Sequence, residues 1–485
     1  MKKRKLLGVG ICLSLPLLLL LPAQSERNGS PLSAANAPAV VIDGAQIWDG
    51  TGRPPIRDAI LVIRGARVEA LGPRGSVQAP QDAVTIPAKG KTIIPGLINT
   101  HGHVGMTKGL KSARENYTRD NVVSQLKQYA RYGVTTIMSL GTDFEPMSEI
   151  RGAARPEEPV RATVFTAGRG FTGKNGYPAV LPGNAGVPRE VDTIEEVQSQ
   201  VQELARQKVD MVKIWVDDHW GHYSKIRPEL YRAIIAEAHK HNLRVMAHLF
   251  YLEDAKELVK AGLDGMAHSV RDREVDGELI QALKARKTFA VPTLVREEST
   301  FIYAEPPAFL DDPFFSRWAD PLVVRQLKDP AYGARIKSDP DFSRYPGQLK
   351  TGQKNLKKLW DAGVTIALGS DSGPPARFQG FFEHRELELM VQAGLTPAPA
   401  YFALRAQRLL REAGLTKDDL TAVVVKNRAH GEHNEHAMFR KPVTADDVLA
   451  SRVVSEPLHL WMLCSPNEGA AAASMCQRRS CRMAT

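Results

Sequence analysis

From residue 92 onwards, short apolar runs alternate with longer segments whose apolar positions recur every three or four residues. Runs of the first kind predict strands, and the amphipathic segments predict helices. The predicted strands are Leu97–His101, Val134–Leu140, Thr163–Ala167, Met211–Val216, Arg244–Phe250, Gly265–Val270, Phe289–Leu294 and Thr365–Gly369. The predicted helices are Val122–Tyr132, Ile194–Gln207, Pro228–His241, Glu253–Ala261, Leu279–Ala285 and Leu349–Ala362. This alternation predicts an α/β fold, with a TIM-like (β/α)8 barrel favoured and an open doubly wound sheet as the alternative.

A different pattern precedes this region. Residues 39–91 contain short apolar runs separated by turns with glycine or proline, and the clearest strands are Val40–Ile42, Ile60–Ile63 and Arg67–Leu71. We expect these strands to form a small N-terminal β domain. Another segment, Arg296–Tyr345, follows neither period and contains several prolines and aromatic residues. We interpret it as irregular, either a lid over the barrel mouth or a peripheral insertion.

The first 25 residues have the pattern of an export signal. A basic start at positions 2–5 precedes the apolar run Leu6–Pro22, and the small residues of Ala23–Ser25 suit cleavage. An uncleaved membrane anchor is the alternative, but about 17 residues with a proline among them are marginal for crossing a bilayer. We expect residues 1–25 to be removed, residues 26–38 to form a linker, and the protein to be periplasmic or secreted without a stable membrane partner.

Composition narrows the class of protein. The 485 residues are 43% apolar and 24% charged, which is typical of a soluble globular protein with one large domain and additional parts. The formal net charge of +10 falls to about +6 without the four basic residues at positions 2–5. Because no basic stripe is interleaved with aromatic residues, nucleic-acid binding is not expected. Beyond the signal, cysteines occur only at 464, 476 and 481, so the main fold needs no disulfide.

Polar side chains occur near the carboxyl ends of five predicted strands, where the active sites of (β/α)8 barrels lie. They are His101, His103, Lys213, His248, His268 and Asp371. Because side chains alternate along a strand, His101 and His103 point to the same side. Each of the six can be a hydrogen-bonded core residue or a cap, but burying the whole group without compensation costs roughly several kcal/mol per residue. A bound zinc-like cation would offset that cost, since imidazole and carboxylate are common ligands.

The segment Pro95–His103, taken with the other four polar residues, resembles the amidohydrolase superfamily, and most closely its imidazolonepropionase-like and prolidase-like branch. The likeness covers about residues 39–398, with the metal-dependent barrel at residues 92–398. It implies a hydrolase that cleaves C–N bonds in a small-molecule substrate such as an amide, dipeptide or cyclic amide. A homo-oligomer is compatible with it, and the sequence leaves the oligomeric state open.

The resemblance also implies two divalent metal ions, with zinc favoured. The implied ligands are His101 and His103 for one metal, His248 and His268 for the other, a carbamate on Lys213 that bridges both, and Asp371 at the first metal. Two metals that share a water lower its pKa and make hydroxide available, and the aspartate can accept its proton. Candidate substrate-binding residues lie in loops after the strands: Arg169, Lys174, Asn175, Tyr177, Asp217, Asp218, His219, His222 and Arg271.

After about residue 399 the sequence changes character. Amidohydrolases usually return at this point to complete the small β domain, and no such strand run follows, so we expect that domain to be incomplete. Residues 399–473, in segments such as Val423–Asn427 and Asn467–Ala472, instead resemble an internal fragment of a sterol-carrier or lipid-transfer thiolase. Residues 474–485 resemble neither family. Two alternative functions remain: a non-catalytic, poorly folding fusion remnant, and a CoA-binding module in the tail.

Overall fold

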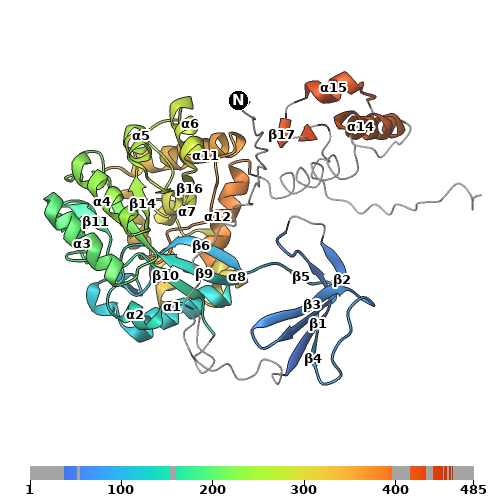
Figure 1. The fold of residues 1–485 in the computed structure, drawn as a ribbon, viewed down its shortest axis with the longest axis horizontal. Helices are drawn as coiled ribbons and strands as arrows, with labels where there is room; N and C mark the ends of the chain where they lie inside the picture. The colour runs from blue at the N-terminus through green and yellow to red at the C-terminus, as the bar shows by residue number, and fades with distance from the viewer. Residues whose placement is uncertain are drawn as a thin grey trace, which may run out of the picture. The chain divides into compact units, whose positions relative to one another are not determined.

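The computed structural model describes residues 38–51, 55–152, 160–395, 416–432, 441–451, 453–455, 458–459 and 461. The chain divides into two compact units, Met1–Ile94 and Pro95–Thr485 (Figure 1). The export signal, nearly all of the linker, residues 474–485 and much of the thiolase-like segment lie outside the described residues. Among the described helices, none is long and apolar enough to cross a membrane.

The first unit is a small mixed sheet of order β3-β2-β1-β4, in which β5 also pairs with β1. Its strands are β1 (Ala39–Ile47), β2 (Ile56–Arg64), β3 (Arg67–Pro73), β4 (Val84–Pro87) and β5 (Thr92–Ile93). Alternating apolar side chains of β1 and β2 fill two small cores, one on each face. The sequence pattern missed β4 and β5 because they are short, and β4 exposes all of its residues.

Parallel strands form the centre of the second unit, and helices lie around them (Figure 1). One sheet has the order β10-β9-β6, and the other has the order β12-β11-β13-β14-β15-β16. The strands are β6 (Leu97–Gly102), β9 (Val134–Ser139), β10 (Thr163–Thr166), β11 (Phe171–Gly173), β12 (Arg189–Val191), β13 (Met211–Val216), β14 (Arg244–Leu249), β15 (Gly265–Ala267) and β16 (Phe289–Val291). This arrangement confirms the predicted α/β class.

The helices between these strands agree closely with the amphipathic segments. They are α1 (Arg119–Arg131), α3 (Ile194–Arg206), α4 (Pro228–Lys240), α5 (Leu252–Ala261), α6 (Gly277–Arg286) and α11 (Tyr345–Asp361), and α12 (Phe381–Gln392) follows them outside the predicted segments. Local signals set their ends: Thr193 and Glu196 form a capping box at the start of α3, and Gly262 ends α5 with a φ of 105°. Shorter elements are β7 (Thr107–Lys108), β8 (Lys111–Ser112), η2 (Arg114–Asn116) and α2 (Pro146–Ile150).

The prediction of a continuous eighth strand at Thr365–Gly369 is wrong. Ile366 forms an isolated parallel bridge with Ala290 of β16, and Ser372 forms one with Gly102 of β6. The segment passes close to both strands, since a Cβ on Gly369 would lie 2.3 Å from a methyl carbon of Val291 on β16 and 2.9 Å from Cβ of His101 on β6. Residues 366–372 therefore touch the edge strands of both sheets through single bridges and not through a ladder.

The prediction that Arg296–Tyr345 is irregular is also wrong. It contains the end of α7 (Leu294–Glu298), then α8 (Pro313–Ser316), α9 (Pro321–Leu327) and α10 (Pro330–Lys337), with the 3-10 turns η3 (Ile302–Ala304), η4 (Ala308–Asp311) and η5 (Phe342–Arg344). Helices α8, α9 and α10 each begin at an Asp-Pro pair, in which the aspartate accepts a backbone N–H and the proline occupies the first helical position. Such short helices show no clear periodicity. Their apolar side chains pack in one core with α12.

The C-terminal part is described only in pieces. These are α14 (Lys417–Glu432), α15 (Ala445–Ala450), β17 (Val453–Ser455) and β18 (Leu458–His459). The side chain of Thr444 and that of Asp447 form a capping box at the start of α15. None of the six residues proposed for the metal centre belongs to this part of the sequence.

Candidate metal centre

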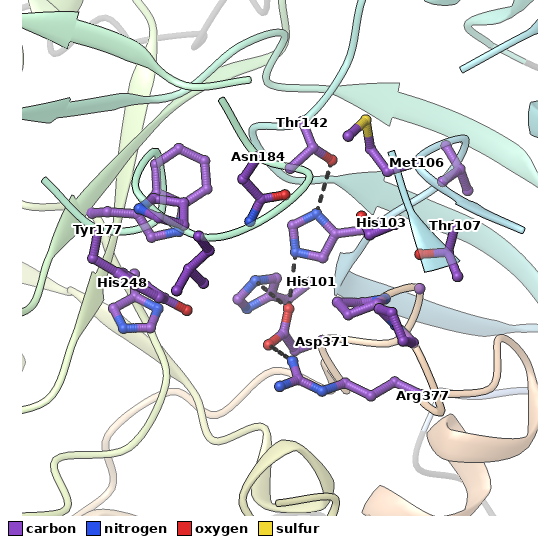
Figure 2. A pocket seen from close by; sticks show the side chains of 18 of the residues that line it. His101, His103, Met106, Thr107, Thr142, Tyr177, Asn184, His248, Asp371 and Arg377 are labelled. Atoms are coloured by element: carbon purple, nitrogen blue, oxygen red, sulfur yellow. Dashed lines mark hydrogen bonds and ion pairs between the residues drawn. The ribbon is translucent and has the colours of Figure 1, made fainter. Parts of the chain in front are cut away.

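Strand β6 delivers two histidines to its carboxyl end, and the chain after residue 366 brings an aspartate against them. His101 is buried, and its Nε2 lies 3.4 Å from Oδ1 of Asp371. Nε2 of His103 lies 2.9 Å from the same oxygen. The backbone fixes this approach, because the Asp371 N–H donates to the carbonyl of His101 at 2.7 Å. The structure therefore brings His101, His103 and Asp371 together, as their proposed role at one metal requires (Figure 2).

Two further histidines complete a continuous group of imidazoles. His248 lies on β14, and His268 directly follows β15. The ring centroids of His268 and His248 are 4.4 Å apart, and those of His268 and His101 are 4.8 Å apart. Three of the rings are oriented by partners: His103 Nδ1 by Thr142 Oγ1 at 3.1 Å, His268 Nδ1 by Thr293 Oγ1 at 2.6 Å, and His248 Nε2 by Asp217 Oδ2 at 2.7 Å. Such partners fix ring orientation in metal sites.

Lys213 lies in the fully buried strand β13. Its Nζ has no hydrogen-bond partner among the described residues. Burial lowers the pKa of this lysine to about 7, although the carboxylate of Asp371 opposes the shift. The stem packs against two glycines: a Cβ on Gly141 would lie 2.8 Å from Lys213 Cγ, and one on Gly170 would lie 2.9 Å from Lys213 Cβ. The sequence therefore leaves room for a long side chain inside the core.

Burial keeps three of the histidines, His101, His248 and His268, in the neutral form. It lowers the pKa values of His101 and His268 well below the ordinary value, and it lowers that of His248 to about 3 even though Asp217 opposes it. Burial alone would raise the pKa of Asp371, but the charge of Arg377 and the neighbouring histidines hold it well below its usual range. Neutral imidazole and ionised carboxylate are the forms that coordinate a cation.

A divalent cation fits this group of side chains. Ligand atoms of His101, His268 and Asp371 lie within 4.8 Å of one another. Nδ1 of His101, like Nζ of Lys213, is buried without a hydrogen-bond partner among the described residues. An unsatisfied buried polar atom costs about 1–3 kcal/mol of folding free energy. A bound group that interacts with these two nitrogen atoms would remove that cost.

The centre opens into a cavity of about 360 Å³. Five of the six proposed ligands line it, together with Tyr177, Trp215 and Arg377. Figure 2 shows Arg377 against the face of Asp371 that points away from His103, and Nη1 of the arginine lies 2.6 Å from Oδ2 of the aspartate. A cavity of this size admits a small molecule.

The candidate substrate-binding residues predicted from the sequence differ in whether they lie at the cavity. Tyr177 lines the cavity. Arg169 instead braces its own loop through the carbonyls of Gly186, Val187 and Pro188. Asp217 orients His248, and His222 is exposed and lies 3.4 Å from Asp341. Arg271 is buried, with an exposed fraction of 2%, and it does not line the large cavity.

Sequence reasoning missed three contributors: Thr142, Thr293 and Arg377. Thr142 follows β9 by three residues and Thr293 follows β16 by two, whereas Arg377 lies in the loop before α12. A threonine or arginine at such a position has no motif of its own. Only the folded geometry shows that the two threonines hold His103 and His268 and that the arginine holds Asp371.

Comparison with known proteins agrees with this geometry. Residues 92–410 match the amidohydrolase family. The chain belongs to the amidohydrolase family. Members of this family are hydrolases that generally depend on metal, which accords with the cluster of His101, His268 and Asp371. The family resemblance predicted from the sequence is thereby confirmed.

Relatives of the amidohydrolase chain were found among curated proteins and solved structures. An uncharacterized protein of Mycobacterium bovis is 26% identical over 214 residues, which cover 43% of this chain and 52% of that protein. A solved Xaa-Pro dipeptidase with bound methionine is 20% identical, with a TM-score of 0.56 over 77% of this chain and 89% of its own. The A. niger ochratoxinase is 20% identical, with a TM-score of 0.55 over 75% of this chain and 82% of its own. At these identities the two structures show a shared fold.

The thiolase likeness is also found. The benzoylsuccinyl-CoA thiolase subunit of Thauera aromatica is 41% identical over 75 residues, which cover 16% of this chain and 20% of that protein. The chain thus spans one fifth of the thiolase subunit and about half of the mycobacterial relative. The thiolase similarity is that of a fragment, as the sequence predicted.

Proposed function

We propose that this amidohydrolase is a metal-dependent hydrolase of C–N bonds in a small amide, dipeptide or cyclic amide, and that its parallel strands close into a (β/α)8 barrel around the metal centre. The observation that carries the proposal is the convergence of four imidazoles and a carboxylate near the carboxyl ends of the strands, with the buried lysine of β13 within reach of the carboxylate's charge. The two bridges made by residues 366–372 to β16 and β6 support the closure.

In the proposed centre, His101, His103 and Asp371 hold one divalent ion, with zinc favoured, and His248 and His268 hold a second. Lys213 joins the two ions after carbamylation. Its neutral amine nitrogen would form a bond to the carbon of CO2 while one C=O π bond breaks onto oxygen, and it would release a proton to water, which leaves an anion with two oxygens. The pKa of about 7 and the unpartnered Nζ favour this reaction. When bound, the ions act as Lewis acids on a substrate carbonyl and lower the pKa of water.

Asp371 is placed to move a proton. Oδ1 faces His101 and His103, and Oδ2 faces Arg377. We propose that this carboxylate accepts a proton from the attacking water and passes it to the leaving nitrogen. Tyr177 and Trp215 line the same cavity and reduce the access of bulk water to the reacting atoms.

A hydrolysis screen tests the function. Protein purified from bicarbonate medium with zinc is assayed against N-acyl amino acids and dipeptides, and chelator-treated protein is assayed beside it. We expect hydrolysis that the chelator abolishes, loss of at least about 100-fold in His101→Asn, since a ligand mutation removes the centre, and retention in His222→Asn, which changes an exposed histidine. Fully metal-loaded protein that hydrolyses none of the compounds would contradict the proposal.

We also propose that the chain is exported and matures near Glu26, with a β domain at residues 39–91, the barrel at 92–398 and the thiolase-like segment at 399–473. N-terminal sequencing of protein from cell fractions tests the export. We expect a new N-terminus near Glu26 in the periplasmic or secreted fraction. Intact Met1 on cytosolic protein would reject it.

A further inference from the structure

A second, smaller cavity lies beside the metal centre, with a volume of about 50 Å³. It is lined by Asp217, His219, Trp220, Phe250, Arg271, Arg296, Thr300, Tyr345 and Gln348. As little as about 10–15 Å³ admits one water molecule, so this cavity has room for a group of a few atoms. Nothing in the hydrolytic centre uses its two arginines.

Arg271 is the most deeply buried charged group of this wall, at 2% exposure. Its Nη1 donates to the carbonyls of Leu249 and Ser269 at 3.1 and 2.8 Å, and its Nε lies 3.1 Å from Oε1 of Glu297. Neither its Nη2 nor its Nε makes a hydrogen bond among the described residues, and the contact of Nε with Glu297 is an ion pair only. A buried guanidinium whose N–H groups lack acceptors is costly, so the arginine favours a further acceptor.

Arg296 shares the same counter-ion. Its Nη1 lies 2.9 Å from both oxygens of Glu297. One buried carboxylate therefore serves two buried guanidinium groups, and this triad carries one excess positive charge. The other carboxylate on the wall, Asp217, is committed to His248 at 2.7 Å. A second anionic acceptor would complete the triad, and a planar carboxylate matches the fork of an arginine.

The small cavity is linked to the metal centre by two side chains. Asp217 lines the cavity and also holds His248. Tyr177 lines the large cavity, and its ring centroid lies 5.2 Å from that of His248 and 4.3 Å from that of His219, which lines the small one. A substrate whose reacting carbonyl lies at the histidines thus has a cationic pocket at the neighbouring strand end.

We propose that the cavity lined by Arg271 and Arg296 is a carboxylate-binding subsite, so that the substrate of the proposed hydrolase carries a free carboxylate. This inference rests on the proposed function for the identity of the ligand. It deepens that function by restricting the substrate to acidic small molecules, such as an N-acyl amino acid or a peptide with its carboxyl end free.

Calorimetric titration of the full chain without added metal tests the subsite. The probes are N-acetyl-L-alanine and its carboxamide, which differ only in the charged end. We expect the acid to bind at least about tenfold more tightly than the amide. Arg271→Gln should abolish this preference, because it removes the free donor pair. Glu297→Gln should strengthen acid binding several-fold, because it removes the competing carboxylate, and a damaged fold cannot produce tighter binding.

Arg385→Gln is the matched control. It breaks the neighbouring buried pair with Glu298, one residue further along α7, which does not line the small cavity. The preference for the acid should survive in this variant. Equal binding of acid and amide by the parent protein, or weaker acid binding in Glu297→Gln, would overturn the subsite and show a cavity that holds water only.

The two proposals fail separately. The same preparations are analysed for metal and for hydrolysis after zinc is added. If the protein binds the acid more tightly than the amide but hydrolyses neither class of substrate, the subsite is supported and the proposed reaction is contradicted. Hydrolysis with no difference between acid and amide substrates, and no effect of Arg271→Gln on that ratio, sinks the subsite alone.

Discussion

The side chain of Lys213 extends through a core that two glycines keep open. Gly141 has a φ of 100°, and a Cβ there would lie 2.8 Å from Lys213 Cγ and 2.8 Å from the Trp215 ring. Gly133 also has a positive φ, 75°, but a Cβ there would contact nothing within 4 Å. A substitution at Gly133 therefore tests backbone strain alone, whereas a substitution at Gly141 tests the same strain together with displacement of Lys213.

We predict that Gly133→Ala costs about 1–2 kcal/mol of stability through its left-handed backbone alone and leaves metal content unchanged. Gly141→Ala should cost at least as much and should also lower metal content, because the new methyl group pushes Lys213 away from the histidines. Urea unfolding and metal analysis of both variants measure this. Equal metal content in the two variants would show that the lysine position is not critical.

At this scale the six proposed ligands could be predicted from the sequence, because histidine, lysine and aspartate at strand ends form a recognisable set. Their partners could not. Thr142 and Thr293 lie next to the histidines only after the strands assemble, and nothing in a threonine after a strand indicates that role. Of the two buried arginines of the small cavity, Arg271 is among the candidate substrate-binding residues of the sequence, whereas Arg296 begins the segment predicted to be irregular, and nothing in the sequence indicates the burial of either.

Among the elements, α7 depends on a distant helix for its N-terminus. Its N-cap, Thr293, makes no capping bond with its side chain. The carboxylate of Glu386 on α12 instead accepts from the N–H groups of Leu294 and Val295 at 2.9 and 2.7 Å. Those bonds favour the ionised form, but burial outweighs them and raises the pKa of Glu386 to about 8.

This pKa sets the direction of a pH effect. The folded protein keeps the Glu386 proton up to about pH 8, whereas the unfolded chain loses it near its ordinary value of 4.5. The contribution to stability is therefore greatest at low pH and is lost as pH rises from 4.5 to 8, by up to about 1.4 kcal/mol per pH unit. Glu386→Gln should flatten this part of the stability profile, and exposed Glu388→Gln should not. Urea unfolding at pH 5, 6.5 and 8 measures it, and parallel profiles for Glu386→Gln and the parent would contradict the assignment.

Elements with a regular period were predictable, and those without one were not. Strand β13 and the α3 and α4 helices lie within one residue of their predicted ends, because their apolar pattern and caps are local. The short helices α8, α9 and α10 were not predicted, because the Asp-Pro pair at the start of each is their only signal in the sequence. The segment at 365–369 failed because its apolar run is held by single bridges on either side.

At the scale of the whole molecule, the first unit exposes apolar side chains on its edge strands. Val68 on β3 is 62% exposed, and Val84 and Ile86 on β4 are 61% and 47% exposed. Edge strands with exposed apolar residues favour association with other chains. Within the part of the chain that the structure describes, β4 pairs with β1 alone.

We predict that Val84→Lys combined with Ile86→Lys raises the soluble monomer yield without changing the metal ratio, since β4 lies in the first unit and all six proposed ligands lie in the second. Size-exclusion chromatography and metal analysis of the purified variant check this. A fall in yield would show that these side chains are covered by another part of the chain.

The central claim is that Lys213 bridges two metals in a centre built from His101, His103, His248, His268 and Asp371. The most direct test is the metal-to-protein ratio of the parent chain and of Lys213→Ala, both purified from medium with zinc and bicarbonate. The account predicts about two ions per parent chain and one or none in Lys213→Ala, because both sites lose a bridging oxygen. A parent chain without metal, or a Lys213→Ala chain that keeps two ions, would contradict it.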